Sequence, residues 1–244
     1  MNKIAVVTGA NRGLGKAIVE RLAEEKYDVW ACARKKTEEY EKYLCELSEQ
    51  YDVKVRPVYF DLTNPEEVKN GYKQICQIEK RVDVLINNAG IGHMELFQLT
   101  KMERIREIFE VNFFAPLELT QLFLRNMCRQ KSGKIINVVS TAANEVYVGN
   151  AIYGSSKAAL SMFVKSLAAE TFGYGVTVNA IAPGLIDTDM SSIFEGKDPE
   201  EPIKHTALAR KIYPNEIADV IIELLSDNMK ILNGEVIYVH GGHK

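Results

Sequence analysis

The feature that most constrains the fold is a regular alternation of short apolar runs with stretches of helical period. The apolar runs are of strand length, and in the stretches between them apolar residues recur every three or four positions. Several runs are almost continuously apolar, such as IAVV at 4–7 and IINVV at 135–139, as expected of strands covered on both faces. Strands separated by helices need crossover connections, so the sequence predicts a parallel sheet between two helical layers.

The expected elements run from one end of the chain to the other. Strands are predicted over residues 3–7, 28–33, 54–60, 82–87, 134–140, 176–182 and 235–240. Helices are predicted over 14–26, 38–50, 65–78 with Asn64 as its cap, 101–112, 117–129, 153–172 and 215–225. Together they predict an α/β fold in a single domain over 1–244, a doubly wound parallel sheet of about seven strands. The irregular stretch at 188–210 is expected to be a substrate lid, with a surface excursion as the alternative.

Composition and charge exclude several classes of protein. The 244 residues are 46% hydrophobic and 26% charged, which is typical of a globular protein rather than a disordered one. A net charge of -3 gives no basic field for nucleic acid, so no such partner is expected. No segment reaches the roughly 18 uninterrupted apolar residues of a membrane-spanning helix, and the first strand follows almost directly on Met1. We therefore expect no membrane association and a cytoplasmic location.

A glycine-rich turn, TGANRGLG at 8–15, follows the first predicted strand. Glycines allow a sharp turn and a close approach to a pyrophosphate, whose charge the next helix N-terminus meets. Alone, such a trio fits an ordinary tight turn equally well, but its place between the first strand and the first helix favours dinucleotide binding. The residues expected to contact the dinucleotide here are Gly9, Asn11, Arg12, Gly13, Leu14 and Gly15.

The end of the second predicted strand indicates which dinucleotide is bound. NAD-binding units usually carry an acidic residue there for the ribose 2′-hydroxyl, whereas this chain reads Ala33-Arg34-Lys35. Arg34, with Arg12 from the glycine turn, suits a 2′-phosphate instead. The sequence thus favours NADP(H), the alternative being that these cations are only solvated.

A candidate acid–base group lies in the C-terminal half of the chain. Tyr153 and Lys157 are four residues apart on a predicted helix, so they share one face. The nearby ammonium is expected to lower the pKa of the phenol toward neutrality. Ser140 is expected at the carboxyl end of a parallel strand, where such sheets bind their ligands. The coincidence of the three predicts a site that handles a proton.

Together with NNAG at 87–90, Asn112 and Pro183-Gly184, these residues resemble the short-chain dehydrogenase/reductase family over residues 3–242. The resemblance implies a Rossmann-type fold in which Tyr153 is the general acid and Ser140 hydrogen-bonds the substrate oxygen. Lys157 would lower the tyrosine pKa and hold the nicotinamide ribose. Asn112 would support a water that relays protons to Lys157; without the resemblance it reads as a polar residue at a helix break before Pro116.

The same resemblance implies further cofactor contacts. Asp61 and Leu62 would contact the adenine, although Asp61 also fits a plain turn residue at a strand end. The other implied positions are Asn88 and Ala89 beside the adenosine ribose, Ile186 and Thr188 at the carboxamide, and Gly90, Pro183 and Gly184 in the same site. The spacing of His240 and His243 lacks supporting carboxylates or cysteines, so no metal site is expected.

Within the family, the pattern is most similar to NADPH-dependent 3-oxoacyl-[acyl-carrier-protein] reductases, through SGKIINVVS at 132–140 and GVTVNAIAPGLIDTDM at 175–190. This implies an enzyme of fatty acid biosynthesis acting on the CH-OH group. It also implies a homotetramer or homodimer paired through the helices at 117–129 and 153–172. The carrier protein would meet the cations Arg125, Arg129 and Lys131.

Two departures leave the substrate open. Tyr174 stands where the resemblance leads us to expect an arginine, and the predicted lid carries carboxylates that would repel an acidic carrier, namely Glu195, Asp198, Glu200 and Glu201. A short-chain dehydrogenase acting on a sugar or another small alcohol or ketone is therefore the alternative. A non-catalytic NADP(H)-sensing regulator is a third reading, against which the intact Ser140, Tyr153 and Lys157 set argues.

Overall fold

Seven parallel strands form the centre of the computed structural model, which describes residues 2–193 and 206–242. They are β1 (Ile4–Thr8), β2 (Asp28–Ala33), β3 (Val55–Tyr59), β4 (Val84–Asn87), β5 (Gly133–Val138), β6 (Val176–Pro183) and β7 (Val236–Val239). Their order across the sheet is β3-β2-β1-β4-β5-β6-β7, with every pairing parallel. The chain thus winds outward from β1 in both directions, and the predicted fold class is confirmed.

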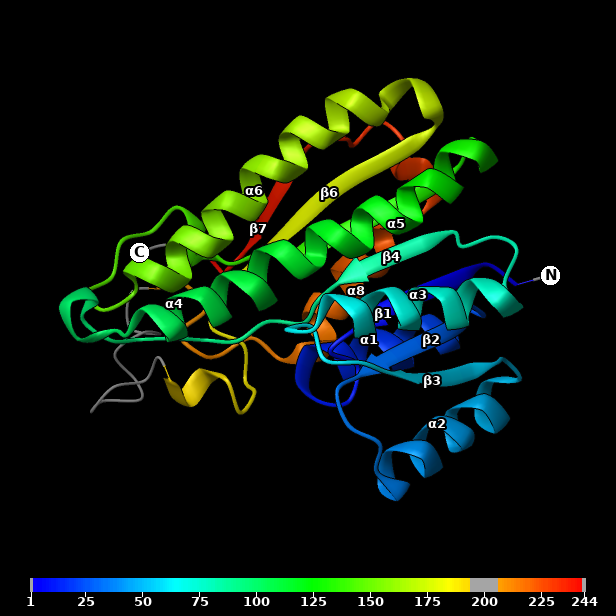
Figure 1. Cartoon of the computed structure of the whole chain (residues 1–244), viewed down its shortest axis with the longest axis horizontal. Helices are drawn as coiled ribbons and strands as arrows, with labels where there is room; N and C mark the ends of the chain where they lie inside the picture. Colours follow the sequence, from blue (N-terminus) through cyan, green and yellow to red (C-terminus); the bar gives the residue numbers. More distant parts are fainter. Residues whose placement is uncertain (1, 194–205, 243–244) are drawn as a thin grey trace.

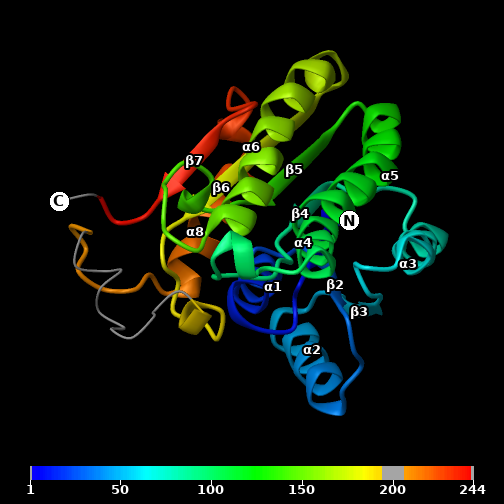
Figure 2. The same ribbon diagram turned by 60° about the vertical axis from the view of Figure 1, so that its left-hand side comes forward.

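Helices cover both faces of this sheet (Figures 1 and 2). On one face lie α1 (Gly13–Glu24), α2 (Glu38–Tyr51) and α8 (Pro214–Leu224); on the other lie α3 (Pro65–Ile78), α5 (Ala115–Gln130) and α6 (Ala151–Thr171), with α4 (Met102–Phe109) packed near α6. Successive strand residues alternate between the two cores: Ala5 and Val7 of β1 join the first, Ile4 and Val6 the second. This double burial explains the continuous apolar runs in the sequence.

Most predicted elements are present with ends shifted by one or two residues. β2 and α3 have the predicted bounds, and Asn64 caps α3, since its Oδ1 accepts the N–H groups of Glu66 at 3.2 Å and Glu67 at 3.4 Å. Local capping chemistry therefore sets this helix start.

The stretch 101–129 differs from the prediction of two helices with a break between them. α4 and α5 are joined by a π-helical turn, Glu110–Phe114, in which the N–H of Ala115 bonds to the carbonyl of Glu110 five residues back. The wider turn shifts the hydrogen-bond pattern, so that Pro116, which has no N–H, enters the next helix without a break. Asn112 lies inside this turn rather than at a helix end.

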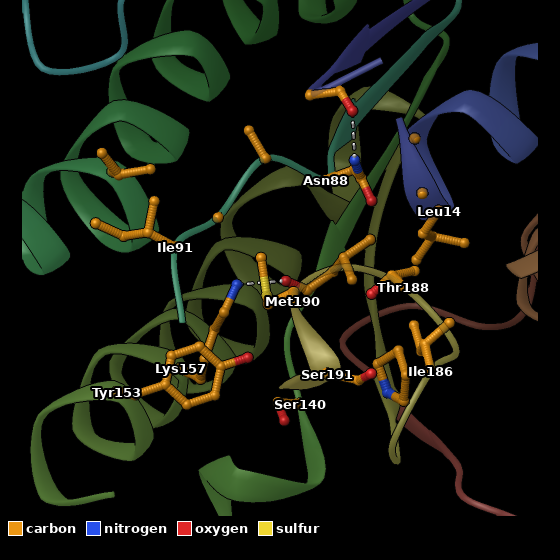
Figure 3. A pocket seen from close by; sticks show the side chains of 18 of the residues that line it. Leu14, Asn88, Ile91, Ser140, Tyr153, Lys157, Ile186, Thr188, Met190 and Ser191 are labelled. Atoms are coloured by element: carbon orange, nitrogen blue, oxygen red, sulfur yellow. Dashed lines mark hydrogen bonds between the residues drawn. The ribbon is translucent and has the colours of Figure 1, made fainter. Parts of the chain in front are cut away.

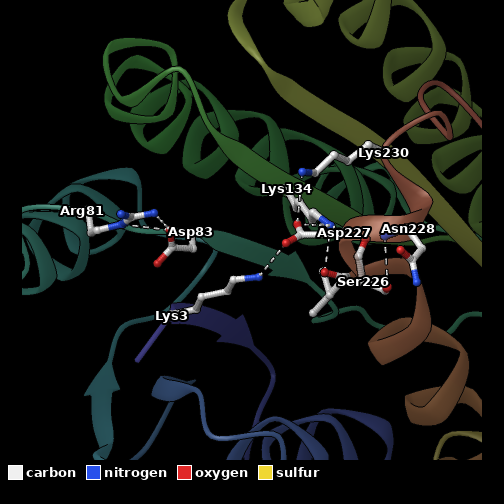
Figure 4. A network of polar contacts seen from close by, with 9 residues as sticks. Lys3, Arg81, Asp83, Lys134, Ser226, Asp227, Asn228 and Lys230 are labelled. Atoms are coloured by element: carbon white, nitrogen blue, oxygen red, sulfur yellow. Dashed lines mark hydrogen bonds and ion pairs between the residues drawn. The ribbon is translucent and has the colours of Figure 1, made fainter. Parts of the chain in front are cut away.

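Lys134 fastens the edge of the sheet at which the strands begin (Figure 4). Its ammonium donates to the carbonyls of Leu225 and Ser226, at 2.7 and 2.6 Å, where α8 ends. Asp227 lies 3.8 Å from both Lys3 and Lys230. Burial lowers the pKa of Lys134.

Of the helices within residues 2–193 and 206–242, none combines the length and apolar character needed to cross a membrane.

Candidate active site

A cavity of about 1420 Å³ lies along the carboxyl ends of the strands, where ligands bind in open parallel sheets. Every residue predicted to contact the cofactor lines it, as does Ser140. The predicted site residues that line the cavity are Gly9, Asn11, Arg12, Gly13, Leu14, Gly15, Arg34, Asp61, Leu62, Asn88, Ala89, Gly90, Ser140, Tyr153, Lys157, Pro183, Gly184, Ile186 and Thr188.

The glycine turn is built so tightly that side chains do not fit. Gly9 has φ +65°, a backbone region that favours glycine. A Cβ on Gly15 would lie 2.0 Å from the carbonyl oxygen of Gly9. Asn88 holds the turn from the β4 side, because its Nδ2 donates to the carbonyls of Thr8 at 2.9 Å and Gly9 at 3.3 Å. The glycines therefore leave backbone exposed at the point where a pyrophosphate would approach.

The first turn of α1 faces this cradle. The N-cap residue of α1 is Arg12, and its side chain makes no capping hydrogen bond to the helix. The N–H groups of the first turn of α1 are therefore not capped by that side chain. The guanidinium of Arg12 instead pairs with Asp189 at 3.1 Å, and both side chains are exposed. Uncapped helix N–H groups beside a glycine cradle fit the phosphates of a dinucleotide.

The adenosine half of the cofactor is expected to lie at the carboxyl ends of β2 and β3. Arg34 is exposed directly after the buried Ala33, and its charge is one of the smaller contributions that lower the pKa of Asp61. The main cause is hydrogen bonding, since Oδ1 of Asp61 accepts the N–H and the hydroxyl of Thr63 at 2.9 and 2.8 Å. Asp61 is thus a turn residue at a strand end that also lines the cavity, and its contact with an adenine stays a prediction.

Tyr153, Lys157 and Ser140 meet at the other end of the cavity (Figure 3). Tyr153 and Lys157 are buried on one face of α6, and the ammonium of Lys157 donates to the carbonyl of Val138 at 2.9 Å. Burial lowers the pKa of Lys157 to about 8. Ser140 lies two residues beyond the end of β5, not within it as predicted. The strand ends at Val138, and Ser140 caps the next short turn by accepting the N–H of Ala142 at 3.2 Å.

The prediction that the pKa of Tyr153 is lowered toward neutrality was wrong for this structure. Burial raises the pKa of Tyr153, and a hydrogen bond with Ser140 offsets only part of that rise. The physical reason is desolvation of the phenolate, while the ammonium of Lys157 is itself engaged by Val138. The phenol is therefore held in its protonated form.

Asn112 is fully buried behind the cavity and holds the segment after β4 in place. Its Oδ1 accepts the N–H of Ile91 at 2.8 Å, and its Nδ2 donates to the carbonyl of Ile91 at 3.0 Å and the hydroxyl of Ser156 at 3.2 Å. A Cβ on Gly90 would lie 3.3 Å from both Asn112 Oδ1 and Lys157 Nζ. The missing side chain leaves the space between these two polar atoms open.

Other cavity residues were missed by sequence reasoning. Most come from loops outside the motifs, and Met190 is the last residue of the motif at 175–190; the residues are Met94, Glu145, Tyr147, Asn150, Met190 and His240. Periodicity carries no signal for such residues, although Glu145 and Tyr147 lie between the two motif residues Ser140 and Tyr153. Glu195, Asp198, Glu200, Glu201 and His243 lie outside the described residues.

The cations expected to meet a carrier protein lie away from the cavity. Arg125 and Arg129 are exposed on the last turns of α5, and Lys131 follows that helix just before β5 begins. They thus occupy the edge where strands start, whereas the cavity lies at the edge where strands end.

Comparison with known proteins gives a consistent result. Residues 3–198 match the family model described as short chain dehydrogenase. Two similar curated proteins are the 3-oxoacyl-[acyl-carrier-protein] reductases of Aquifex aeolicus, 34% identical, and Vibrio cholerae, 35% identical, each alignment covering 98% of this chain and 96% of the relative.

Two solved structures share the fold and most of the length. A putative NAD(P)-dependent gluconate 5-dehydrogenase from Beutenbergia cavernae with bound NADP has a TM-score of 0.92 and 30% identity, covering 98% of this chain and 95% of that one. L-sorbose reductase from Gluconobacter frateurii, complexed with NADPH and L-sorbose, has a TM-score of 0.89 and 29% identity, covering 99% and 96%. The chain therefore belongs to the short-chain dehydrogenase family of nicotinamide-dependent oxidoreductases.

Proposed function

We propose that the protein is an NADP(H)-dependent carbonyl reductase acting between a ketone and its secondary alcohol. The observation that carries this proposal is the meeting of Ser140, Tyr153 and Lys157 at one end of a cavity whose other end is the glycine turn. This arrangement supports a reaction in which a proton donor and a bound dinucleotide face the same space.

The chain's own residues handle the substrate oxygen and its proton. The hydroxyl of Ser140 hydrogen-bonds the ketone oxygen, and Tyr153, whose raised pKa keeps the phenol protonated, donates its proton to that oxygen. The bound nicotinamide supplies the hydride to the carbon. Hydride and proton together reduce the C=O bond by two electrons to an alcohol.

Lys157 and Asn112 complete the proton path in this proposal. An ammonium on the same helix face as Tyr153 favours the phenolate left after proton transfer, and Lys157 would also hold the ribose of a bound nicotinamide. Its pKa near 8 allows it to gain and lose a proton close to neutral pH. We infer that a water in the space beside Gly90 connects Lys157 to Asn112 and returns the proton to Tyr153.

The cofactor assignment rests on the cations at the adenosine end. Arg34 follows Ala33, where an acidic residue would disfavour a phosphate, and Arg34 is exposed and lines the cavity. Arg12 is within the same cavity lining, and its exposed pair with Asp189 can be exchanged for a phosphate at small cost. The NADP and NADPH named for the two solved structures support the same choice.

Two substrate classes have specific support. The names of the curated relatives favour a 3-oxoacyl thioester, although carrier docking at Arg125, Arg129 and Lys131 would not face the cavity of the same chain. The titles of the solved structures favour a sugar or small hydroxyketone. We propose residues 188–210 as the substrate lid, since its described ends contribute Ser191 and Thr206 to the cavity.

Steady-state oxidation of NADPH with an acetoacetyl thioester, hydroxyacetone and L-sorbose tests the proposal. We expect turnover with at least one of these carbonyl compounds and a lower kcat/KM with NADH. Tight NADPH binding without turnover of any ketone would overturn the reductase and favour the regulator. Equal kcat/KM for the two cofactors would overturn only the NADP assignment.

A further inference from the structure

We infer that Asn150 is a specificity-determining residue whose side-chain amide donates a hydrogen bond to a second oxygen of the substrate, so that the enzyme selects ketones with an oxygen acceptor close to the reacting carbonyl. The inference rests on the proposed function, because it takes Tyr153 as the acid at that carbonyl. Asn150 lines the same cavity as Tyr153 and is only 5% exposed.

The side-chain amide of Asn150 is unpaired in the part of the chain that the structure describes. Among residues 2–193 and 206–242, its Oδ1 is enclosed without a partner, and its side chain does not cap the first turn of α6. Its backbone groups are both used, since its N–H donates to the carbonyl of Tyr147 at 3.2 Å and its carbonyl accepts the N–H of Gly154 at 2.8 Å. Burying an unpaired amide is unfavourable, so its presence calls for an explanation.

Helix capping does not account for this asparagine, as a comparison with α3 shows. Asn64 occupies the same position in α3, has extended backbone angles (φ -118°, ψ 100°) and caps that helix through its Oδ1. Asn150 has φ -101° and ψ 9°, outside the extended region that is typical of a capping residue. The backbone at Asn150 therefore turns the side chain away from the helix N–H groups, and its amide stays available to a ligand.

Successive turns of α6 bring three polar groups to the cavity in a fixed order. Asn150, Tyr153 and Lys157 follow the i, i+3, i+7 spacing of one helix face, and all three are buried and line the cavity. In the proposed function Lys157 holds the nicotinamide ribose and Tyr153 meets the reacting carbonyl. Asn150 lies on the side of Tyr153 away from Lys157, about 4.5 Å along the helix axis. It therefore meets the part of the substrate beyond the reacting carbonyl.

The amide nitrogen is the atom that a substrate reaches. A Cβ on Gly154 would lie 3.7 Å from Asn150 Nδ2 and 2.8 Å from the carbonyl oxygen of Ala142, which belongs to the short turn that Ser140 caps. The amide thus lies where that turn meets α6. Because Oδ1 is the enclosed atom, Nδ2 is left to donate to an oxygen in the cavity. A substrate with an alkyl group there would leave this donor unpaired.

Matched ketones test the inference and separate two sources of the acceptor oxygen. Ethyl acetoacetate is paired with 4-ethoxy-2-butanone, which lacks only the ester carbonyl, and hydroxyacetone with 2-butanone, which has a methyl group in place of the hydroxyl. Because the members of a pair differ in intrinsic reactivity, the ratio of their kcat/KM values is compared between wild type and variant. For at least one pair, Asn150→Leu should lower this ratio about three- to tenfold, the range for one hydrogen bond. The pair that responds identifies the acceptor.

Further variants identify the donor and control for the substitution. Asn150→Asp replaces the donor by an acceptor, so it should lower the ratio of the ester pair, whose extra carbonyl only accepts, and keep that of the hydroxyl pair. Asn144→Leu is the matched control, since Asn144 is exposed, precedes α6 and does not line the cavity; its ratios should equal those of the wild type. Urea unfolding gives a second readout. Asn150→Leu removes an unpaired buried amide, so its unfolding midpoint should equal or exceed that of the wild type.

Failure of the inference differs from failure of the proposed function. Ratios that Asn150→Leu leaves unchanged in both pairs would overturn the contact while reduction of the ketones continues. A lower unfolding midpoint together with unchanged ratios would assign the amide a structural role instead. If Asn150→Leu does not fold, as judged by circular dichroism, Asn150→Ala decides, because it removes the amide without adding volume. No NADPH oxidation with any ketone would overturn the proposed reductase, and the inference with it.

Discussion

Tyr153 is buried beside Ser140, and that burial holds its phenol as an acid. Tyr153→Phe removes the proton and little volume, so the cavity should still bind NADPH with nearly unchanged affinity. Because a positioned acid contributes at least ~100-fold, we expect kcat to fall by that factor or more. Stopped-flow turnover and a fluorescence titration of NADPH measure the two effects. A variant retaining more than a tenth of wild-type kcat would remove Tyr153 from the mechanism.

Lys157 makes stability depend on pH in a predictable direction. Its pKa is near 8 in the folded protein, against 10.5 for a lysine side chain in water. Below pH 8 both states carry the proton, and the cost of the buried charge is fully present. Between these pKa values the unfolded chain holds a proton that the folded chain has lost, so the free energy of unfolding rises with pH, by about 3 kcal/mol in total.

Urea unfolding of the wild type and Lys157→Met at several pH values from 7 to 10 measures this contribution. The methionine variant lacks the titrating group, so the wild type should gain stability relative to it as pH rises. Curves that stay parallel across the range would show that the pKa of Lys157 is not lowered by folding.

Arg34 should determine the choice between the two nicotinamide cofactors. Arg34→Asp replaces a cation at the cavity edge by a carboxylate, which repels a 2′-phosphate and accepts the ribose hydroxyls of NADH. We expect NADPH binding to weaken by ~1.5 to 3 kcal/mol, the range for a charged hydrogen bond, and NADH binding to improve. Isothermal titration of both cofactors measures this.

Lys36→Asp is the control for Arg34→Asp. Lys36 carries the same charge two residues along, pairs with Glu41 at 3.1 Å and does not line the cavity. Its cofactor preference should match that of the wild type. If both variants weaken NADPH binding equally, the effect of Arg34 is one of general charge and not of a specific contact.

Motif residues could be predicted individually because backbone geometry leaves them few alternatives. Gly15 has no room for a Cβ, and the pairing of Tyr153 with Lys157 follows from helical spacing. The pKa direction of Tyr153 could not be predicted in the same way, since it depends on burial by distant segments. Glu145 and Tyr147 lie in a loop whose path is set by contacts with residues far along the chain, such as Glu95.

The π-helical turn is the element that joins the segment after β4 to α6. Asn112 in this turn bonds both backbone groups of Ile91 and the hydroxyl of Ser156, with its side chain fully buried. Asn112→Ala leaves these groups without their partner, so the free energy of unfolding should fall by about 1 to 3 kcal/mol.

Chemical denaturation of Asn112→Ala and of Asn144→Ala measures that loss. Asn144 is exposed, and its replacement should change stability little. Equal stability of Asn112→Ala and the wild type would mean that water replaces the lost amide, and the turn would then tolerate many residues at this position.

Elements were predictable where a single local signal fixed their ends. Asn64 and Pro65 set the start of α3, whereas the stretch around Pro116 combines a proline, a polar residue and a continuous helical path that no local rule distinguishes from a break. The strand before Ser140 was predicted too long for a related reason. Apolar character continues through Val139, whose N–H still bonds to the carbonyl of Ile181 at 2.8 Å, yet the ladder to β6 ends at Val138 although β6 itself runs on to Pro183.

At the scale of the whole molecule, α6 presents an outer face that the described part of the chain leaves exposed. Met162 is 63% exposed, and Ala169 on the same helix is exposed as well. We predict self-association through α5 and α6 into a dimer or tetramer, since a two-fold contact covers such a face economically. Ala169→Arg should then lower the mass measured by analytical ultracentrifugation. It should also reduce activity indirectly, because Tyr153 and Lys157 lie on the same helix.

The control for this change is Lys165→Arg, which keeps a long cationic side chain at an exposed position of the same helix. Its mass should equal that of the wild type. A wild-type protein that sediments as a monomer at micromolar concentration would contradict the assembly while leaving the proposed chemistry intact.

The pairing of β1 with β4 sets the order in which such a chain can become active. β1, β2 and β3 are neighbours in sequence, but β4 must find β1 across a separation of 79 residues, as in the bond from Ile4 N to Asp83. Contacts between distant segments form slowly, since a long loop must first be closed. The glycine turn is held by Asn88 only after this closure. During refolding, the helical circular-dichroism signal should therefore return before NADPH binding does. NADPH binding then reports the formation of the pairing between β1 and β4.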